Sequence, residues 1–332
     1  MSFDYERFNR RYGPWISLGL GLATVLLVHR GAGYAPVAVA FLVVGWMLAL
    51  ALRRWLDATK ASADEAKAGR LRRLLPKAAA TASVGLYQNV LFFLVPIWAA
   101  SATWPTVNVV FPILLAAMAL FSCFEYPYRA FVLDRPAVLG VFSAVTLFAA
   151  LVPASAVLLD IPLRFALGGS ALVAGLATAV GVVPLRRLGW RKGVPVMLGA
   201  LGLALGILVP SGPFLPPVPV VCVGRDAGTG IAGRELVGRA ASFPIGTERV
   251  YAWFSVSAPS RWRQPVRFVW FHDGVPSGDP LDHEVTGGRE TGFRTWTWRK
   301  SPGAGEWRVD LVTDSEQLVG RVRFRVGDDR KD

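Results

Sequence analysis

Tryptophan and arginine side chains in the C-terminal third of this sequence are the ones whose types could recognise a ligand. Trp262 is followed by Arg263, and Trp298 is followed by Arg299. A guanidinium group is attracted to the face of an exposed indole, and such a surface could bind sugar rings or an acidic polymer. The alternative is that these arginines only cover the indoles.

Three further arginines occupy every second position near the C-terminus. Arg321, Arg323 and Arg325 alternate with apolar residues, so a β-strand would place all three on one face. This basic stripe could meet anionic lipid headgroups or an acidic partner. It could equally protect an edge strand from pairing with another chain. The sequence therefore leaves two hypotheses open for this stripe, a binding surface for an envelope glycan or a protein partner and protection of an edge strand.

The histidines and acidic residues of the C-terminal part are of types that can catalyse reactions or bind metals. His272, Asp273, Asp282, His283 and Glu284 could ligate a metal, but neither H-x-x-E-H nor H-E-x-x-H spacing occurs. A turn histidine that bonds a backbone group is the expected role. The sequence also has no G-x-S-x-G elbow, Walker loop or dinucleotide-binding glycine motif. We therefore predict no cofactor, no metal, no catalytic residue and a non-enzymatic role.

Polar side chains inside apolar segments are the remaining candidates. Gln88, Asn89 and Asn108 lie within long apolar stretches. One hypothesis is a small polar site between the third and fourth stretches, where prolines free backbone carbonyls. The other is that these amides hydrogen-bond between helices and only hold a bundle together.

Apolar stretches in the N-terminal two thirds must position these amides. Because a bilayer core of about 30 Å is crossed by about 20 apolar residues in a helix, each such stretch is a candidate transmembrane helix. We therefore expect an all-α transmembrane bundle of about seven helices over residues 1–209. The stretches are 13–29, 35–52, 78–100, 104–124, 137–159, 163–183 and 193–209.

Basic residues between these stretches predict the orientation in the bilayer. With the N-terminus in the cytoplasm, the cytoplasmic segments hold 17 Lys and Arg residues, whereas the opposite loops hold 2, Arg30 and Arg164. Basic residues near transmembrane ends resist translocation, so we expect an inner-membrane protein with its C-terminal domain outside the cytoplasm. Cleavage of the first stretch as a signal peptide, near Ala38 and Ala40, would leave the C-terminus on the same side.

Periodicity changes to two in the C-terminal part, as in half-buried strands. Residues 210–217 form a proline-rich linker that favours an extended spacer. The alternating runs beyond it predict a small all-β, immunoglobulin-like sandwich over residues 218–328. The clearest runs are 249–256, 265–272, 306–313 and 318–326.

The net charge of +13 lies mainly outside this domain. Residues 1–217 contain 19 basic and 8 acidic residues, whereas residues 218–332 contain 17 and 15. A nucleic-acid-binding protein would need the excess clustered on a soluble face. We therefore predict the lipid bilayer, and no nucleic acid, as a partner.

The C-terminal part resembles a known bacterial family. Residues 270–274 read WFHDG, residues 293–300 read FRTWTWRK, residues 305–309 read GEWRV and residues 324–326 read FRV. This order is similar to domain of unknown function 2914, although Phe293 stands where that family usually has tryptophan. The helical part resembles domain of unknown function 5924, which precedes the first in some bacterial proteins. The resemblance implies this domain order and no activity.

Three functions follow as hypotheses. The first is an envelope protein in which the bundle is an anchor and the sandwich an extracytoplasmic binding module. The second is a membrane enzyme or carrier with a site lined by Gln88, Asn89 and Asn108. The third is an envelope sensor that signals through a partner protein.

Overall fold

The chain folds into two compact units. The computed structural model describes residue 19 and residues 87–159, 161–182, 209–260, 263–289 and 291–327. Among these, the helical unit contains 87–96, Ile113–Leu158 and the residues from Leu167 to Val182. The β unit contains Ile97–Pro112, Leu159–Ala166 and the described residues from Val209 onward.

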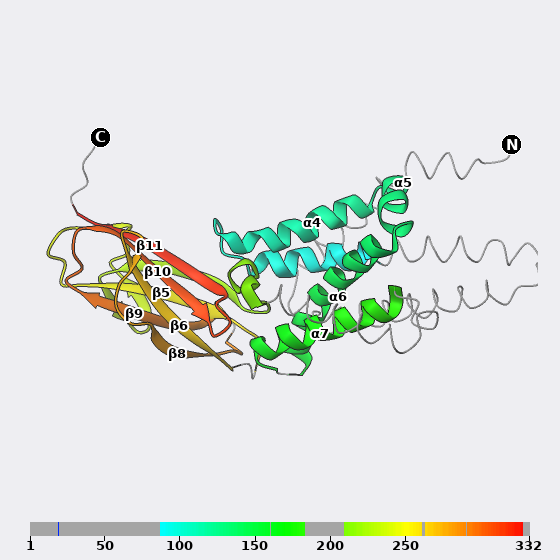
Figure 1. Ribbon diagram of the computed structural model, residues 1–332. Coiled ribbons are helices and arrows are strands. Elements are labelled where there is room, and N and C mark those ends of the chain that lie inside the picture. Colours follow the sequence, from blue (N-terminus) through cyan, green and yellow to red (C-terminus); the bar gives the residue numbers. More distant parts are fainter. Residues whose placement is uncertain are drawn as a thin grey trace, which may run out of the picture. The chain divides into compact units, whose positions relative to one another are not determined.

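Apolar helices joined by aromatic contacts make up the helical unit (Figure 1). The rings of Tyr87 and Tyr128 both pack edge-on against Phe142, at 6.0 and 5.3 Å between centroids. Tyr87 Oη and Ser143 Oγ share a hydrogen bond of 2.9 Å. The described helical segments of the chain are Tyr87–Ala100, η3 (Val107–Val109), α4 (Val110–Ser122), α5 (Glu125–Tyr128), η4 (Arg129–Leu133), α6 (Pro136–Leu158), α7 (Leu163–Val182) and η5 (Val209–Phe214).

The prediction of about seven transmembrane helices is wrong. In the described part of the chain, one helix is long and apolar enough to cross a membrane, Ala137–Val157, and a second span results only if the bent pair Val107–Ser122 and Tyr126–Leu133 is taken as one. Apart from Gly19 and Val209, the predicted stretches 13–29, 35–52 and 193–209 lie outside the described residues, as do residues 78–86 of the third stretch and residue 183 of the sixth.

Part of the difference in the number of spans arises because the described helices are shorter than the apolar stretches of the sequence. Within the stretch 104–124, the α-helix α4 begins only at Val110. Its 13 residues extend about 20 Å. Residues Ile97–Pro112, which include the first three residues of α4, and Leu159–Ala166 belong to the β unit. Hydropathy counts such residues toward a span, although the fold uses them elsewhere.

Two antiparallel sheets form the body of the β unit, so the β-rich C-terminal part is confirmed. One sheet has the order β1-β5-β9, and the other has the order β4-β11-β10-β6-β7, with β8 also paired to β6 (Figure 1). Within the second sheet, only β4 runs parallel to its neighbour, β11. The strands are β1 (Val221–Gly228), β2 (Gly230–Ala232), β3 (Glu235–Val237), β4 (Ser242–Phe243), β5 (Arg249–Ser257), β6 (Arg263–His272), β7 (Val275–Pro276), β8 (Leu281–Thr286), β9 (Phe293–Lys300), β10 (Gly305–Thr313) and β11 (Leu318–Val326).

Aromatic side chains at alternating positions fill the core between the sheets. Trp270, Trp307 and Phe324 are each 5% exposed or less, and Trp307 stacks on Phe324 at 6.3 Å between centroids. Phe254 of the first sheet packs against Phe268 of the second at 5.9 Å. Burial of these rings gives each strand an inner face, which leaves the intervening residues on the outer face.

Gly320 provides a direct test of this packing. A Cβ atom added at this position of β11 would lie 2.9 Å from Cys222 Sγ and 3.1 Å from Phe254 Cδ1. We expect Gly320→Ala to lower the free energy of unfolding by about 1–3 kcal/mol, because the sheets must separate slightly. Thermal unfolding of the full chain in maltoside, followed by near-ultraviolet circular dichroism, measures this loss.

Gly230→Ala is the matched control, because a Cβ atom there would meet nothing within 4 Å. Equal melting temperatures for the two variants would contradict the close packing of β11 against the first sheet.

Candidate functional site

Arginines gather on the outer face of β10 and β11. The antiparallel register places Arg308 opposite Arg323, and Asp310 opposite Arg321. Like charges that face each other across two strands are destabilising, whereas opposite charges stabilise the pair. We use the name arginine cluster for Arg225 of β1 with Arg308, Arg321 and Arg323.

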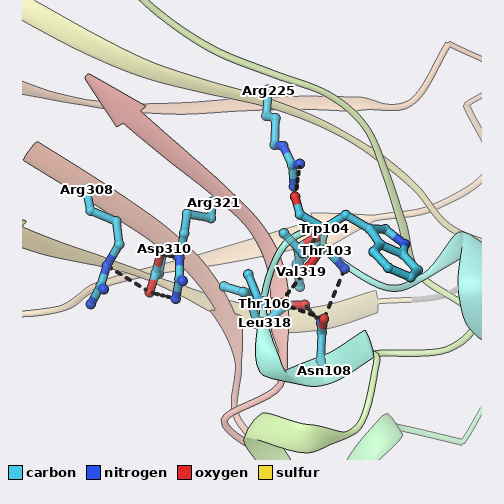
Figure 2. A network of polar contacts seen from close by, with 10 residues as sticks. All are labelled: Thr103, Trp104, Thr106, Asn108, Arg225, Arg308, Asp310, Leu318, Val319 and Arg321. Carbon is cyan, nitrogen blue, oxygen red and sulfur yellow. Dashed lines mark hydrogen bonds and ion pairs between the residues drawn. The ribbon is translucent and has the colours of Figure 1, made fainter. Parts of the chain in front are cut away.

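Asp310 is the single carboxylate that holds this cluster in place. Its oxygens accept hydrogen bonds from Arg321 Nε at 2.6 Å and Arg321 Nη2 at 2.8 Å. Arg308 Nε lies 3.5 Å from the same carboxylate, and Figure 2 shows Asp310 between the two arginines. Because the Asp310 side chain is 8% exposed, the two-pronged bond fixes the guanidinium of Arg321 in one orientation.

Arg308 packs against an aromatic ring. Its guanidinium carbon lies 3.7 Å from the centre of the Phe271 ring, which favours a cation. Burial lowers the pKa of Arg308, and the charges of Arg321 and Arg323 lower it further against the opposing effect of Asp310. Besides Asp310, Glu306 lies opposite Arg325 on these strands, so arginines outnumber carboxylates on the described part of this face.

A loop between two helices closes one side of the cluster. Asn108 is fully buried; its Oδ1 accepts hydrogen bonds from Thr103 N at 3.1 Å and Thr106 Oγ1 at 2.7 Å. Asn108 Nδ2 donates to Leu318 O at 3.2 Å, and Thr103 Oγ1 donates to Val319 O at 3.1 Å (Figure 2). The amide therefore shapes the loop and joins it to β11 at the same time.

The loop and the arginines line an open cavity of about 200 Å³. Arg225 reaches it from β1 and donates from Nη2 to Trp104 O at 3.0 Å. A larger hollow of about 530 Å³ lies on the other side of Arg323, which borders both. The smaller cavity is lined by Thr103, Trp104, Pro105, Thr106, Arg225, Arg321 and Arg323.

Among the predicted binding residues, Arg321 and Arg323 reach this cavity. Arg325 borders the larger hollow with Trp307 and Arg308. Arg263 is exposed at the start of β6, and Trp262 lies outside the described residues.

Trp298 and Arg299 belong to the other sheet and do not stack on each other. Trp298 is 48% exposed, and the guanidinium carbon of Arg249 lies 5.0 Å from its ring centre. Arg299 Nη1 donates to Ser277 O at 2.7 Å, and its guanidinium carbon lies 5.1 Å from the ring centre of Trp307. Covering of an indole by arginine therefore does occur here, with a partner from a neighbouring strand.

The three amides predicted near the third and fourth apolar stretches do not converge on one site. Gln88 is buried in the helical unit and donates to Cys123 Sγ at 3.6 Å. Asn89 is exposed, and Asn108 belongs to the β unit. Each buried amide already has protein partners, which fits a structural role.

Histidine and acidic side chains form no metal site in the described ranges, where no group of three or more His, Cys, Asp or Glu residues could hold an ion. His272 stacks on Trp307 at 4.3 Å between centroids. Its Nε2 lies 2.9 Å from Ala304 O, which is the backbone bond expected of a turn histidine.

Sequence reasoning missed Arg225, Arg308, Asp310 and the loop residue Thr103. Arg308 and Asp310 alternate with buried Val309 and Leu311. Pairing of the runs 306–313 and 318–326 as a hairpin would have placed them beside the basic stripe of Arg321 and Arg323. Nothing local marks the loop, because its bonds join residues 103 and 319, far apart in the chain.

Comparison with known families divides the chain in two. Residues 4–221 match the model of a family of unknown function (DUF5924), and residues 263–326 match that of a protein of unknown function (DUF2914). Both resemblances found in the sequence are thereby confirmed. No curated protein matches the chain. The network of Figure 2 takes its loop from the first match and Arg308, Asp310 and Arg321 from the second.

Asn108 can be tested by substitution. Asn108→Ala removes two buried hydrogen bonds and a partly buried one, so we expect the β unit to lose about 2–3 kcal/mol of stability. Asn89→Ala removes an exposed amide and should change stability by less than about 0.5 kcal/mol. Thermal unfolding of both full-length variants in maltoside compares them; a melting temperature for Asn108→Ala equal to that of Asn89→Ala would show that the loop is not a structural part of the β unit.

Proposed function

The chain belongs to the family of unknown function DUF5924. From its geometry, we propose that it is a non-enzymatic membrane protein of the cell envelope whose β unit is an extracytoplasmic binding module. The observation that carries this proposal is the composition of the β unit. It contains two interhelical segments, Ile97–Pro112 and Leu159–Ala166, together with the C-terminal domain. Segments packed in one compact unit lie on one side of any membrane that the helices cross.

Specific bonds join the second segment to the sheets. Leu163 N donates to Gln264 Oε1 at 3.2 Å, and Arg164 Nη1 lies 3.6 Å from Asp314 Oδ2. Leu163 and Gln264 are both fully buried, so this contact is not a chance meeting of surface residues. The second segment therefore shares its side with the C-terminal domain, as the first does.

Loop charge supports the extracytoplasmic side. The two segments joined to the β unit coincide with loops that the basic-residue count predicts outside, and Arg164 is their one basic residue. Arg129 and Arg135 lie in the helical unit, in the loop predicted to face the cytoplasm. Because basic loops resist translocation, this distribution favours the β unit outside.

Exposed apolar side chains support contact with lipid. The 21 residues of Ala137–Val157 extend about 32 Å, enough to cross a bilayer core. A buried helix of a soluble protein reaches the same length, so the surface of the helical unit is the more telling feature. Large apolar side chains at least 49% exposed are found there, a surface that water does not favour. They include Ile113, Leu120, Phe131, Val141 and Val173.

A membrane enzyme or carrier is less well supported. That function needs Gln88, Asn89 and Asn108 at one site, whereas Asn108 belongs to a different unit and bonds Leu318. The exposed arginine cluster is instead a surface suited to binding.

Labelling of single cysteines with a membrane-impermeant maleimide tests the proposed side. Glu284→Cys places a thiol on exposed β8, and Tyr126→Cys places one at a site that is 81% exposed in the loop predicted to be cytoplasmic. In intact spheroplasts, Glu284→Cys should be labelled and Tyr126→Cys should be labelled only after lysis. The opposite pattern, or equal labelling of both before lysis, would overturn the proposal.

Replacement of Cys123 and Cys222 by alanine gives the background for this assay. Burial raises the pKa of Cys222 to about 11, while the charge of Arg225 acts in the opposite direction. Since the thiolate is the reactive form, the Cys222 thiol is nearly all protonated and slow to label at neutral pH. A variant that retains Cys222 should therefore give a low signal in the same assay.

A further inference from the structure

We propose that the cavity between β1, β11 and the loop at residues 103–106 binds a phosphate group through Arg225, Arg321 and Arg323. This inference names the ligand chemistry of the proposed binding module. It rests on that binding role and is independent of the side of the membrane on which the β unit lies.

Spare hydrogen-bond donors line this cavity. Arg321 gives Nε and Nη2 to Asp310, which leaves Nη1, and Arg225 gives Nη2 to Trp104 O. The Arg323 guanidinium has neither a hydrogen bond nor an ion pair with any residue that the structure describes, and it is exposed. Since each guanidinium carries five donors, the three side chains together offer many unfilled N–H groups to one small space.

Positive charge exceeds negative charge around the cavity. Four arginines of the cluster are accompanied by the single buried carboxylate of Asp310. Arg308 and Arg323 face each other across the strands, where like charges repel. A dianion seated at the cavity would offset this repulsion.

The number and type of donors favour phosphate over a carboxylate. A single arginine can satisfy both oxygens of a carboxylate in a two-pronged bond. Three guanidinium groups around one cavity suit a tetrahedral group with more oxygens and more charge. The hydroxyls of Thr103 and Thr106 already donate to Val319 O and to loop oxygens, so recognition is left to the arginines.

Trp104 supplies an apolar wall for the rest of the ligand. Trp104 is 54% exposed and belongs to the lining of the cavity, and its backbone oxygen accepts the hydrogen bond of Arg225 Nη2. An indole in this position fits the organic part of a phosphate ester, such as the glycerol of a lipid headgroup. Free phosphate has the same anionic group and lacks the organic part. The two ligands would therefore bind the arginines alike, and only the lipid headgroup would also contact Trp104.

Titration calorimetry on the full chain in maltoside tests the site, with two probes measured separately at constant ionic strength. The probes are inorganic phosphate and monomeric short-chain phosphatidylglycerol. We expect at least one probe to bind, and Arg225→Gln or Arg323→Gln to weaken binding by about tenfold or more, because each removes charge-assisted hydrogen bonds. Arg263→Gln, a change to an exposed arginine at the start of β6, should bind like the wild type.

Arg323→Lys separates charge from geometry. It keeps the positive charge and loses the planar fork, so binding should fall between that of the wild type and that of Arg323→Gln. Melting temperatures of all variants without ligand show whether each one folds; Arg323→Gln should melt no lower than the wild type, because it removes a repulsion with Arg308.

Binding of phosphatidylglycerol alone would identify a lipid headgroup, and binding of inorganic phosphate would identify the free anion, with the site confirmed in either case. Absence of binding by both probes, or binding that folded Arg225→Gln and Arg323→Gln variants retain in full, would overturn the inference. The cysteine-labelling result stands apart from this outcome, so failure of the phosphate site and failure of the proposed orientation can be told apart.

Discussion

Satisfaction of the first carbonyl groups of β11 is the interaction on which the β unit depends. Thr103 and Asn108 donate to the oxygens of Val319 and Leu318, and all four residues are buried. The neighbouring strand on the outer side, β4, pairs with β11 only at Arg325 and Val326. Because a buried carbonyl without a donor is unfavourable by about 1–3 kcal/mol, the sheet needs the loop to complete its edge. A segment between two helices is therefore a structural element of a β domain.

Other chain segments meet the same end of the β10–β11 hairpin. Gln317 donates to the oxygens of Leu215 and Pro216, and Asp314 accepts from Gln264, which itself accepts from Leu163. Both interhelical segments and the residues that follow Val209 therefore contact the same end of this hairpin.

Local pattern was sufficient for the strands and insufficient for the helices. Alternation of apolar and polar residues at 249–256, 306–313 and 318–326 predicted β5, β10 and β11. Successive side chains of a strand point to opposite faces, so burial of one face requires an apolar residue at every second position. Apolar runs overstated the number of transmembrane spans, although the run 137–159 coincides with the candidate span Ala137–Val157, because hydropathy does not distinguish a residue inside a bilayer from one packed in another unit. Leu163, in the apolar run 163–183, is fully buried and belongs to the β unit.

In the candidate site, the arginines of β11 could be predicted from the sequence, whereas their contacts with other strands could not. A period of two placed Arg321, Arg323 and Arg325 on one face, but nothing in that pattern pairs Arg321 with Asp310 or brings Arg225 from another sheet. Those contacts depend on strand register and on the order of strands, which are fixed by the whole core. The buried Asp310 could be found only once its neighbours were known.

Edge protection does not explain the arginines once the edge itself is described. An arginine that discourages strand pairing is useful where backbone groups are open to another chain. The loop covers β11 at Leu318 and Val319, and β4 covers it at Arg325 and Val326. Arg321 is also bound to Asp310, which holds it against the sheet rather than over the strand edge. The uncovered part of the edge lies between these ends, at Arg321 and Arg323, and an anion at the site we propose would offset the repulsion between Arg323 and Arg308.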